Sequence, residues 1–123
     1  TKVLFDTAEQ LGVTTVLDTE LAAMTVREAA ERALAAVEGD LPIHLSIDLD
    51  VLPAAVAPGV SAPAGFGVDY AALRAMVAAV ASTGRVALLD VVELNPEFDV
   101  DNRTAKAAAR LIDDAVVGAT GRR

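Results

Sequence analysis

The chain has 123 residues, enough for one domain with a core of its own, and its 54% hydrophobic content excludes a disordered tail. Acidic residues outnumber basic ones by 18 to 10 and aromatic residues make up only 3%, so a nucleic-acid partner is not expected. The absence of cysteine excludes disulfides, thiolate nucleophiles and zinc–cysteine sites, and no apolar run reaches the roughly 18 residues that span a bilayer. We therefore expect a cytoplasmic protein with neither nucleic acid nor a membrane as partner.

The N-terminal third predicts two helices with a short strand between them. Residues 3–11 have the pattern of a helix, and the β-branched run at residues 13–17 predicts a strand. Thr25 and Glu28 have the spacing of a capping box, which opens a second helix with an apolar face. Gly39 is placed to end that helix.

Strands and helices continue to alternate in the middle of the chain. Residues 43–50 predict a strand, and the prolines and glycines of residues 53–68 predict an irregular loop of a length that is often functional. Asp69 is placed to cap the next helix. Residues 85–93 form a nearly continuous apolar run, which is typical of a buried strand.

A final helix is expected over residues 104–117, with Asp101 or Asn102 as its cap. The helices between the strands are long enough for crossover connections. We therefore expect an α/β fold in which three strands run parallel with right-handed connections.

Carboxylates gather where two of these strands end, at the edge where ligands bind in open α/β sheets. Asp48 and Asp50 are two residues apart, which on an extended strand places both side chains on one face with Cα atoms about 7 Å apart. A divalent cation with a preference for oxygen ligands would relieve their repulsion. The alternative is a pair of solvated acids at a strand end. Asp90 and Glu93 end the later strand.

Three ordered blocks of the sequence resemble the ureohydrolases, the family of arginases, agmatinases and formimidoylglutamases. The resemblance implies a three-layer α/β/α fold and covers essentially the whole chain. Arginases and agmatinases usually carry an Asp-Pro pair where this chain has Leu52-Pro53, and arginases have Gly-Thr-Pro where it has Ser61-Ala62-Pro63, so the closest likeness is to formimidoylglutamases. The blocks are Ser46-Ile47-Asp48-Leu49-Asp50 with Ala57-Pro58-Gly59 and Ser61-Ala62-Pro63, then Asp90-Val91-Val92-Glu93-Leu94-Asn95-Pro96, then Asp101-Asn102-Arg103-Thr104-Ala105.

The resemblance also implies a role for each acid. Asp48 matches the carboxylate that bridges two Mn²⁺ ions, Asp50 matches one that binds a single Mn²⁺, and Glu93 matches the acid that holds the cationic amidine or guanidine of a small-molecule substrate. The implied reaction is hydrolysis of N-formimidoyl-L-glutamate to L-glutamate and formamide, in histidine degradation. A guanidine hydrolase of the arginase or agmatinase type is the alternative, as is a homologue that has lost catalysis.

One departure from the family pattern bears on the whole chain. The family site also needs a histidine and an Asp-x-His-x-x-x-Asp block, and neither is present, because His44 is the one histidine. We therefore expect residues 1–123 to be the C-terminal portion of a ureohydrolase catalytic domain, inactive alone. Its sheet would then have an open edge and an open apolar surface, which predicts a homo-oligomer.

Other polar residues have weaker assignments. His44 is either a neighbour of the metal ligands or, as we expect, a buried and hydrogen-bonded core residue. Asp90 either orients a ligand or binds backbone amides, and a substrate-carboxylate role for Arg103 stays open. A phosphatase-like reading with Asp48 as nucleophile is disfavoured, because the chain has only two lysines and such domains need one near the site. Four other arginines are expected to be solvated: Arg27, Arg32, Arg74 and Arg110.

Overall fold

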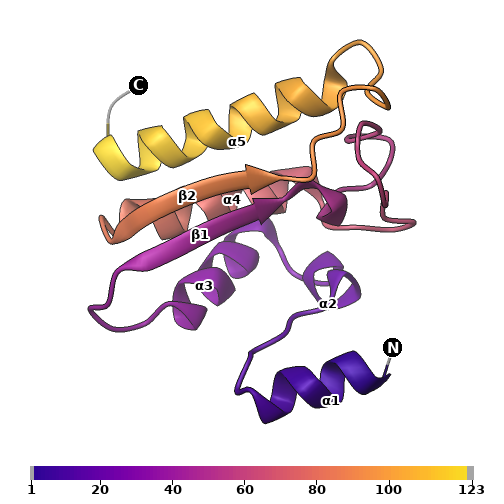
Figure 1. Cartoon of the computed structure of the whole chain (residues 1–123). Coiled ribbons are helices and arrows are strands. Elements are labelled where there is room, and N and C mark those ends of the chain that lie inside the picture. The colour runs from indigo at the N-terminus through magenta and orange to yellow at the C-terminus, as the bar shows by residue number, and fades with distance from the viewer. Residues whose placement is uncertain (1, 122–123) are drawn as a thin grey trace.

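The computed structural model describes residues 2–121 and arranges its helices around a two-stranded parallel sheet (Figure 1). The long helix α5 runs alongside the sheet, and α1 lies at the opposite end of the view. The elements in chain order are α1 (Lys2–Gln10), α2 (Asp18–Ala22), α3 (Val26–Ala36), β1 (Ile43–Asp48), the 3-10 turn η1 (Leu49–Val51), α4 (Tyr70–Ser82), β2 (Val86–Val92) and α5 (Arg103–Thr120). The α/β class and the parallel pairing expected from the sequence are confirmed.

The two strands present one face to the helices and the other to solvent. Leu45 and Ile47 of β1 join the core that α4 and α5 contribute to, whereas the residues that alternate with them are exposed. Asp48, the last residue of β1, lies opposite Val92, the last residue of β2. The carboxyl ends of both strands therefore meet at one edge of the sheet.

Residues 13–17 do not form the strand that their β-branched side chains predict. They run as irregular chain into α2, and Val13 is exposed. High β propensity produces a strand only where a neighbouring strand offers hydrogen-bonding partners, and the sheet in the described residues consists of β1 and β2. α2 is joined instead to the long loop, because the Gly67 amide donates to the Asp18 carboxylate at 3.2 Å.

Two of the expected helix starts are confirmed. The Thr25 hydroxyl accepts from the Glu28 amide at 3.2 Å while the Glu28 carboxylate accepts from the Thr25 amide at 2.7 Å, which is the reciprocal pattern of a capping box. Asp69 caps α4 by accepting from the Ala72 amide at 3.0 Å. Both pairs satisfy amides that have no partner within the helix.

Asn102 occupies the N-cap position of α5 as expected, but the capping side chain is that of Asp99. Asp101 and Asn102 adopt left-handed backbone angles, with φ of 53° and 55°, and the side chain of Asn102 makes no capping bond. This turn brings the chain back so that the carboxylate of Asp99 accepts from the amides of Thr104 and Ala105 at 2.9 and 3.0 Å. Burial alone would raise the pKa of Asp99. The hydrogen bonds from these amides and from the Thr104 hydroxyl outweigh burial, so the pKa of Asp99 lies below its usual value.

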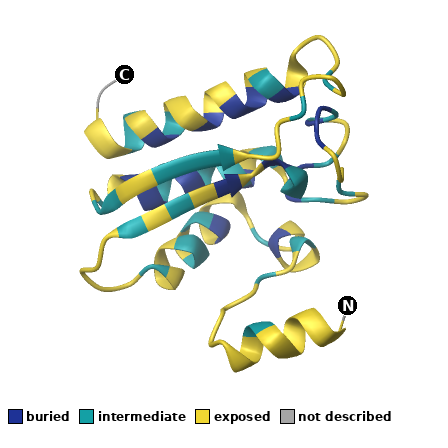
Figure 2. Cartoon of the chain, in the orientation of Figure 1, coloured by how far each residue is buried: buried dark blue, intermediate teal, exposed yellow. Residues whose placement is uncertain are grey.

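The core lies between the sheet and the helices α4 and α5 (Figure 2). Leu49, Leu52 and Leu111 are fully buried in it. α4 and α5 approach closely at Gly118, where a Cβ atom would lie 2.6 Å from the carbonyl oxygen of Ala78. A larger side chain at this position would push the two helices apart.

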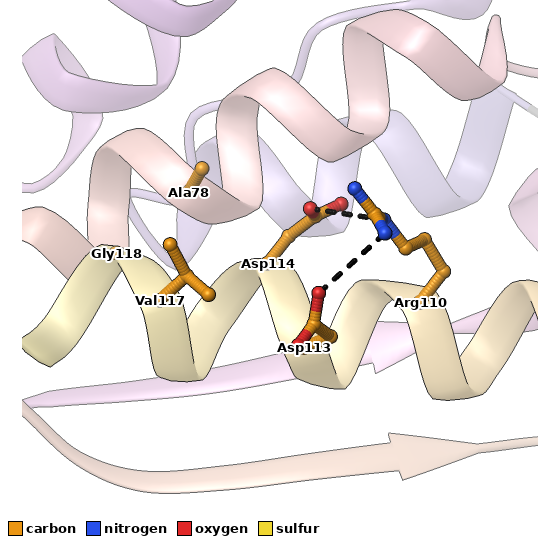
Figure 3. Close-up of a pocket in the computed structure, with 6 residues that line it drawn as sticks. All are labelled: Ala78, Arg110, Asp113, Asp114, Val117 and Gly118. Atoms are coloured by element: carbon orange, nitrogen blue, oxygen red, sulfur yellow. Dashed lines mark ion pairs between the residues drawn. The ribbon is translucent and has the colours of Figure 1, made fainter. Parts of the chain in front are cut away.

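A network of charged side chains crosses the outer side of the same helix pair. The guanidinium of Arg74 binds the Asp114 carboxylate at 2.6 and 3.0 Å and lies over the ring of Tyr70, 5.9 Å from its centroid. Arg110 pairs with Asp113 at 3.6 Å and with Asp114 at 3.4 Å beside a hollow between the helices (Figure 3). The expectation of a solvated Arg74 is therefore wrong, because Asp114 lies opposite it on α5.

Helix α1 has no buried residue. Its apolar side chains Val3, Leu4 and Phe5 are 70%, 68% and 49% exposed, and Figure 2 shows almost the whole helix as exposed surface. Within residues 2–121, no helix combines the length and the apolar character that crossing a membrane requires.

Candidate active site at the carboxyl edge of the sheet

Asp48 stands where β1 ends and the chain turns. Its backbone is still extended, with φ of −87° and ψ of 119°, and its Oδ1 accepts a hydrogen bond from the Asp50 amide at 2.8 Å. This bond caps η1, so the second carboxyl oxygen of Asp48 takes no part in it. Asp48 is exposed, which leaves that oxygen open to a ligand at the edge of the sheet.

Asp50 does not lie on the strand. β1 ends at Asp48, and Leu49 turns into the core with no exposed surface, so Asp50 belongs to η1 and the expected alternation of the two acids along one extended strand is wrong. The Oδ1 atom of Asp50 is buried and has no hydrogen-bond partner within the described residues. A buried carboxylate oxygen without a partner is costly, and a bound cation is one of the few groups that can satisfy it.

Glu93 directly follows Val92, which lies opposite Asp48 in the sheet. Its φ of 70° is unusual for a residue with a side chain. Ser61, from the Pro- and Gly-rich loop, places its hydroxyl 3.4 Å from the Glu93 carboxylate. Strained backbone of this kind concentrates at functional sites, where the surrounding structure holds it in place.

Gly59 fixes the loop that carries Ser61. Its amide donates to the hydroxyl of Thr104 at 2.7 Å, and its carbonyl accepts from the Asn95 amide at 2.8 Å. A Cβ atom at Gly59 would lie 2.5 Å from the Cβ of Asp99, so no other residue fits there without a shift. The loop is therefore joined both to the start of α5 and to the segment that follows Glu93.

A second polar cluster crosses the sheet below this edge. The Asp90 carboxylate lies 2.5 Å from Nε2 of His44 and 2.5 Å from Oγ of Ser46, and the hydroxyl and the imidazole lower the pKa of Asp90. The His44 side chain is 55% exposed, so the expectation of a buried core histidine is wrong, although the expected hydrogen bond exists. Asp90 binds side chains of β1, so backbone-amide binding, one of its two expected roles, is not what the structure shows.

His44, at the far end of this cluster, lies away from the candidate site. His44 is four residues before Asp48, which is about 13 Å along an extended strand. The sequence left open a role for Arg103 in binding a substrate carboxylate. In the structure its guanidinium instead donates to the carbonyl of Ala55. Both contacts join segments of the fold. Position in the sequence could not reveal them, because their partners are more than 40 residues away.

The residues of this edge fit a divalent cation only in part. Asp48 and Asp50 offer oxygen ligands, which suit hard cations such as Mn²⁺, and the unsatisfied oxygen of Asp50 favours such an ion. Within residues 2–121, however, no three side chains of His, Cys, Asp or Glu are grouped closely enough to hold a metal ion. Asp48 and Asp50 are thus two candidate oxygen ligands and do not by themselves make a metal site.

Comparison with known proteins identifies the family. The sequence pattern of the Arginase family matches residues 2–118. The chain belongs to the arginase family. This membership replaces the phosphatase-like interpretation of Asp48.

Relatives within the arginase family agree on a narrower group. The chain is 53% identical over 112 residues to a formimidoylglutamase of Nocardia farcinica. This match covers 91% of this chain and 35% of the relative. It is 46% identical over 114 residues to a formimidoylglutamase of Corynebacterium efficiens, covering 93% of this chain and 36% of the relative. The chain therefore spans about a third of the length of the curated relatives that it matches.

Solved structures confirm the arginase-like fold. An arginase from Bacillus cereus superposes with a TM-score of 0.84 at 27% identity, over 94% of this chain and 40% of that one. A formiminoglutamase from Trypanosoma cruzi, crystallised with Mn²⁺, superposes with a TM-score of 0.72 at 27% identity, over 85% of this chain and 35% of that one.

Proposed function

We propose that this chain is part of an enzyme that hydrolyses N-formimidoyl-L-glutamate to L-glutamate and formamide. The observation that carries the proposal is the placement of three acids where the carboxyl ends of β1 and β2 lie side by side: Asp48 ends β1, Asp50 follows in η1, and Glu93 directly follows β2. A buried oxygen of Asp50 is also left without a partner among the described residues. The similarity to formimidoylglutamases at 46% and 53% identity supports this choice within the family.

The three acids divide into two roles. Asp48 and Asp50 would hold Mn²⁺, for which the family resemblance implies two ions in the complete site, because carboxylate oxygens suit this cation. When bound, the ions supply Lewis-acid activation of water near neutral pH. Glu93 would bind the cationic amidine end of the substrate through its carboxylate, in a charge-assisted hydrogen bond.

The reaction balances as a hydrolysis. Water adds its oxygen to the formimidoyl carbon, and the bond from this carbon to the glutamate nitrogen breaks. A proton passes to that nitrogen, so the products are the free amino group of glutamate and formamide. Glu93 contributes by holding the amidine so that its carbon faces the attacking water.

We propose further that residues 1–123 form the C-terminal portion of the catalytic domain. Two carboxylates are too few for a binuclear site, so the chain alone is expected to bind Mn²⁺ weakly and to release no formamide. Isothermal titration with Mn²⁺ measures this. Tight binding of two Mn²⁺ ions by the chain alone would contradict the proposal.

Substitutions in the complete, Mn²⁺-loaded enzyme separate the two roles. Asp48→Asn should remove most bound metal and most formamide release together, because a metal-binding carboxylate loses its charge. Glu93→Gln should keep the metal while raising KM or lowering kcat, because Glu93 contacts the substrate. If Glu93→Gln removes the metal, its role is wrongly assigned.

A guanidine hydrolase remains the second candidate, since a hypothetical agmatinase from Burkholderia thailandensis superposes with a TM-score of 0.77 at 33% identity. Urea release from arginine or agmatine, with no formamide from formimidoylglutamate, would favour this candidate. We also propose a cytoplasmic homo-oligomer acting on a small molecule. The exposed Leu88 and Val92 on β2 support the oligomer by leaving apolar surface for a partner.

A further inference from the structure

Ser61 contacts Glu93 but has no role in the proposed mechanism. Its hydroxyl is 3.4 Å from Oε2 of Glu93, across 32 residues of sequence. This separation is longer than the optimum of about 2.8 Å for a hydroxyl and an oxygen acceptor. Hydrogen bonds in active sites are often long before the ligand arrives and shorten when it binds.

The structure on both sides holds Ser61 and Glu93 in this relation. Ala57 and Val60, just before Ser61, are buried. The hydrogen bond from the Asn95 amide to the Gly59 carbonyl joins the two segments, and it lies two residues from Ser61 on one side and two from Glu93 on the other. The backbone of Ser61 therefore cannot move far from that of Glu93 without breaking this bond.

The chemistry of the pair suits one class of ligand. A hydroxyl donates one hydrogen and can still accept, whereas an ionised carboxylate only accepts. If Ser61 donates to Oε2 of Glu93, the rotation of the carboxylate is restricted and its other oxygen stays available to a planar N–H donor. An amidinium group is such a donor, and it carries the complementary charge.

We propose that Ser61 is a positioning residue that orients the carboxylate of Glu93 to receive an amidinium group. The inference rests on the proposed substrate-binding role of Glu93 and adds the residue that sets its geometry. Because Ser61 acts through Glu93, it affects binding of N–H-bearing cations and not binding of cations in general. The pair forms a weak amidinium site in this chain itself.

The test is a titration of the ¹⁵N-labelled chain with formamidinium chloride, followed by amide chemical shifts. The amides of Ser61 and Glu93 should shift in a saturable way, and Ser61→Ala should weaken the affinity about tenfold, the effect of one charge-assisted hydrogen bond. Ser61→Thr should restore the affinity, because it keeps the hydroxyl at an exposed position. Ser82→Ala, at a serine whose hydroxyl binds the Ala79 carbonyl, is the matched control and should change nothing.

A second cation distinguishes orientation from charge. Tetramethylammonium has no N–H group, so Ser61→Ala should leave its binding unchanged. The proposal is overturned if Ser61→Ala binds formamidinium like the unsubstituted chain, or if that chain shows no saturable shift. If Glu93→Gln also binds formamidinium normally, the role of Glu93 fails as well. Formamide release by the complete enzyme tests the proposed function separately from the roles of Ser61 and Glu93.

Discussion

Thr104 is the buried hydroxyl through which α5 holds the loop beside Glu93. Its side chain has no exposed surface, its oxygen accepts from the Gly59 amide at 2.7 Å, and it also lowers the pKa of Asp99 by hydrogen bonding. Thr104→Val has nearly the same shape and removes both bonds. A buried amide left without a partner costs about 1–3 kcal/mol, and the lost bond to a carboxylate adds to this, so we expect about 2–3 kcal/mol less stability.

Urea unfolding followed by circular dichroism measures this loss. With m of about 1–1.5 kcal/mol/M for a chain of this size, the midpoint should fall by about 2 M. Thr104→Ser keeps the hydroxyl and should lose only about 1 kcal/mol for the missing methyl group. Thr14→Val, at an exposed threonine in irregular chain, is the control. A midpoint for Thr104→Val equal to that of the control would refute the account of the buried hydroxyl.

Three further changes probe the core, the acid sensitivity and the helix pair. Leu111→Ala, at a fully buried site, should cost about 2–5 kcal/mol in urea unfolding, whereas Leu41→Ala, 79% exposed, should cost little. The pKa of Asp99 is lowered in the fold, so its contribution to the free energy of unfolding is fully present above its unfolded pKa of about 3.9 and is lost as the pH falls through the lower folded value. Asp99→Asn should therefore reduce the drop in melting temperature between neutral and acidic pH. Asp114→Asn should destabilise by about 1–3 kcal/mol, since it weakens two hydrogen bonds from Arg74, and an unchanged urea midpoint would contradict that value.

Local signals in the sequence predicted the local structure well. The capping box at Thr25 and Glu28 and the Asp69 cap depend only on residues three apart, and the structure confirms both. The caps of α5 could not be read in the same way. Asp99 reaches its amides only because two residues take left-handed angles, which shifts the cap by several positions.

Features that depend on distant contacts were less accessible from the sequence. Residues 13–17 have strand propensity, but the sheet within residues 2–121 consists of β1 and β2 and does not include them. The strand pattern through Asp50 was broken because burial of Leu49 turns the chain into η1. The parallel pairing that brings the carboxyl ends of β1 and β2 to one edge was nevertheless foreseeable from the crossover helix between them. Ser61 was part of a quoted motif, yet its proximity to Glu93 depends on a loop conformation that no local pattern encodes.

The absence of any buried residue in α1 has a consequence for how the chain melts. A helix of 9 residues without buried side chains is close to the limit of stability in water, because isolated helices below about 12–15 residues are marginal. Its amide protons should exchange with solvent by fraying, at rates near those of an unstructured peptide, while those of α5 wait for global opening. The ellipticity at 222 nm will therefore decline gradually before the cooperative transition, and this early slope reports α1 alone.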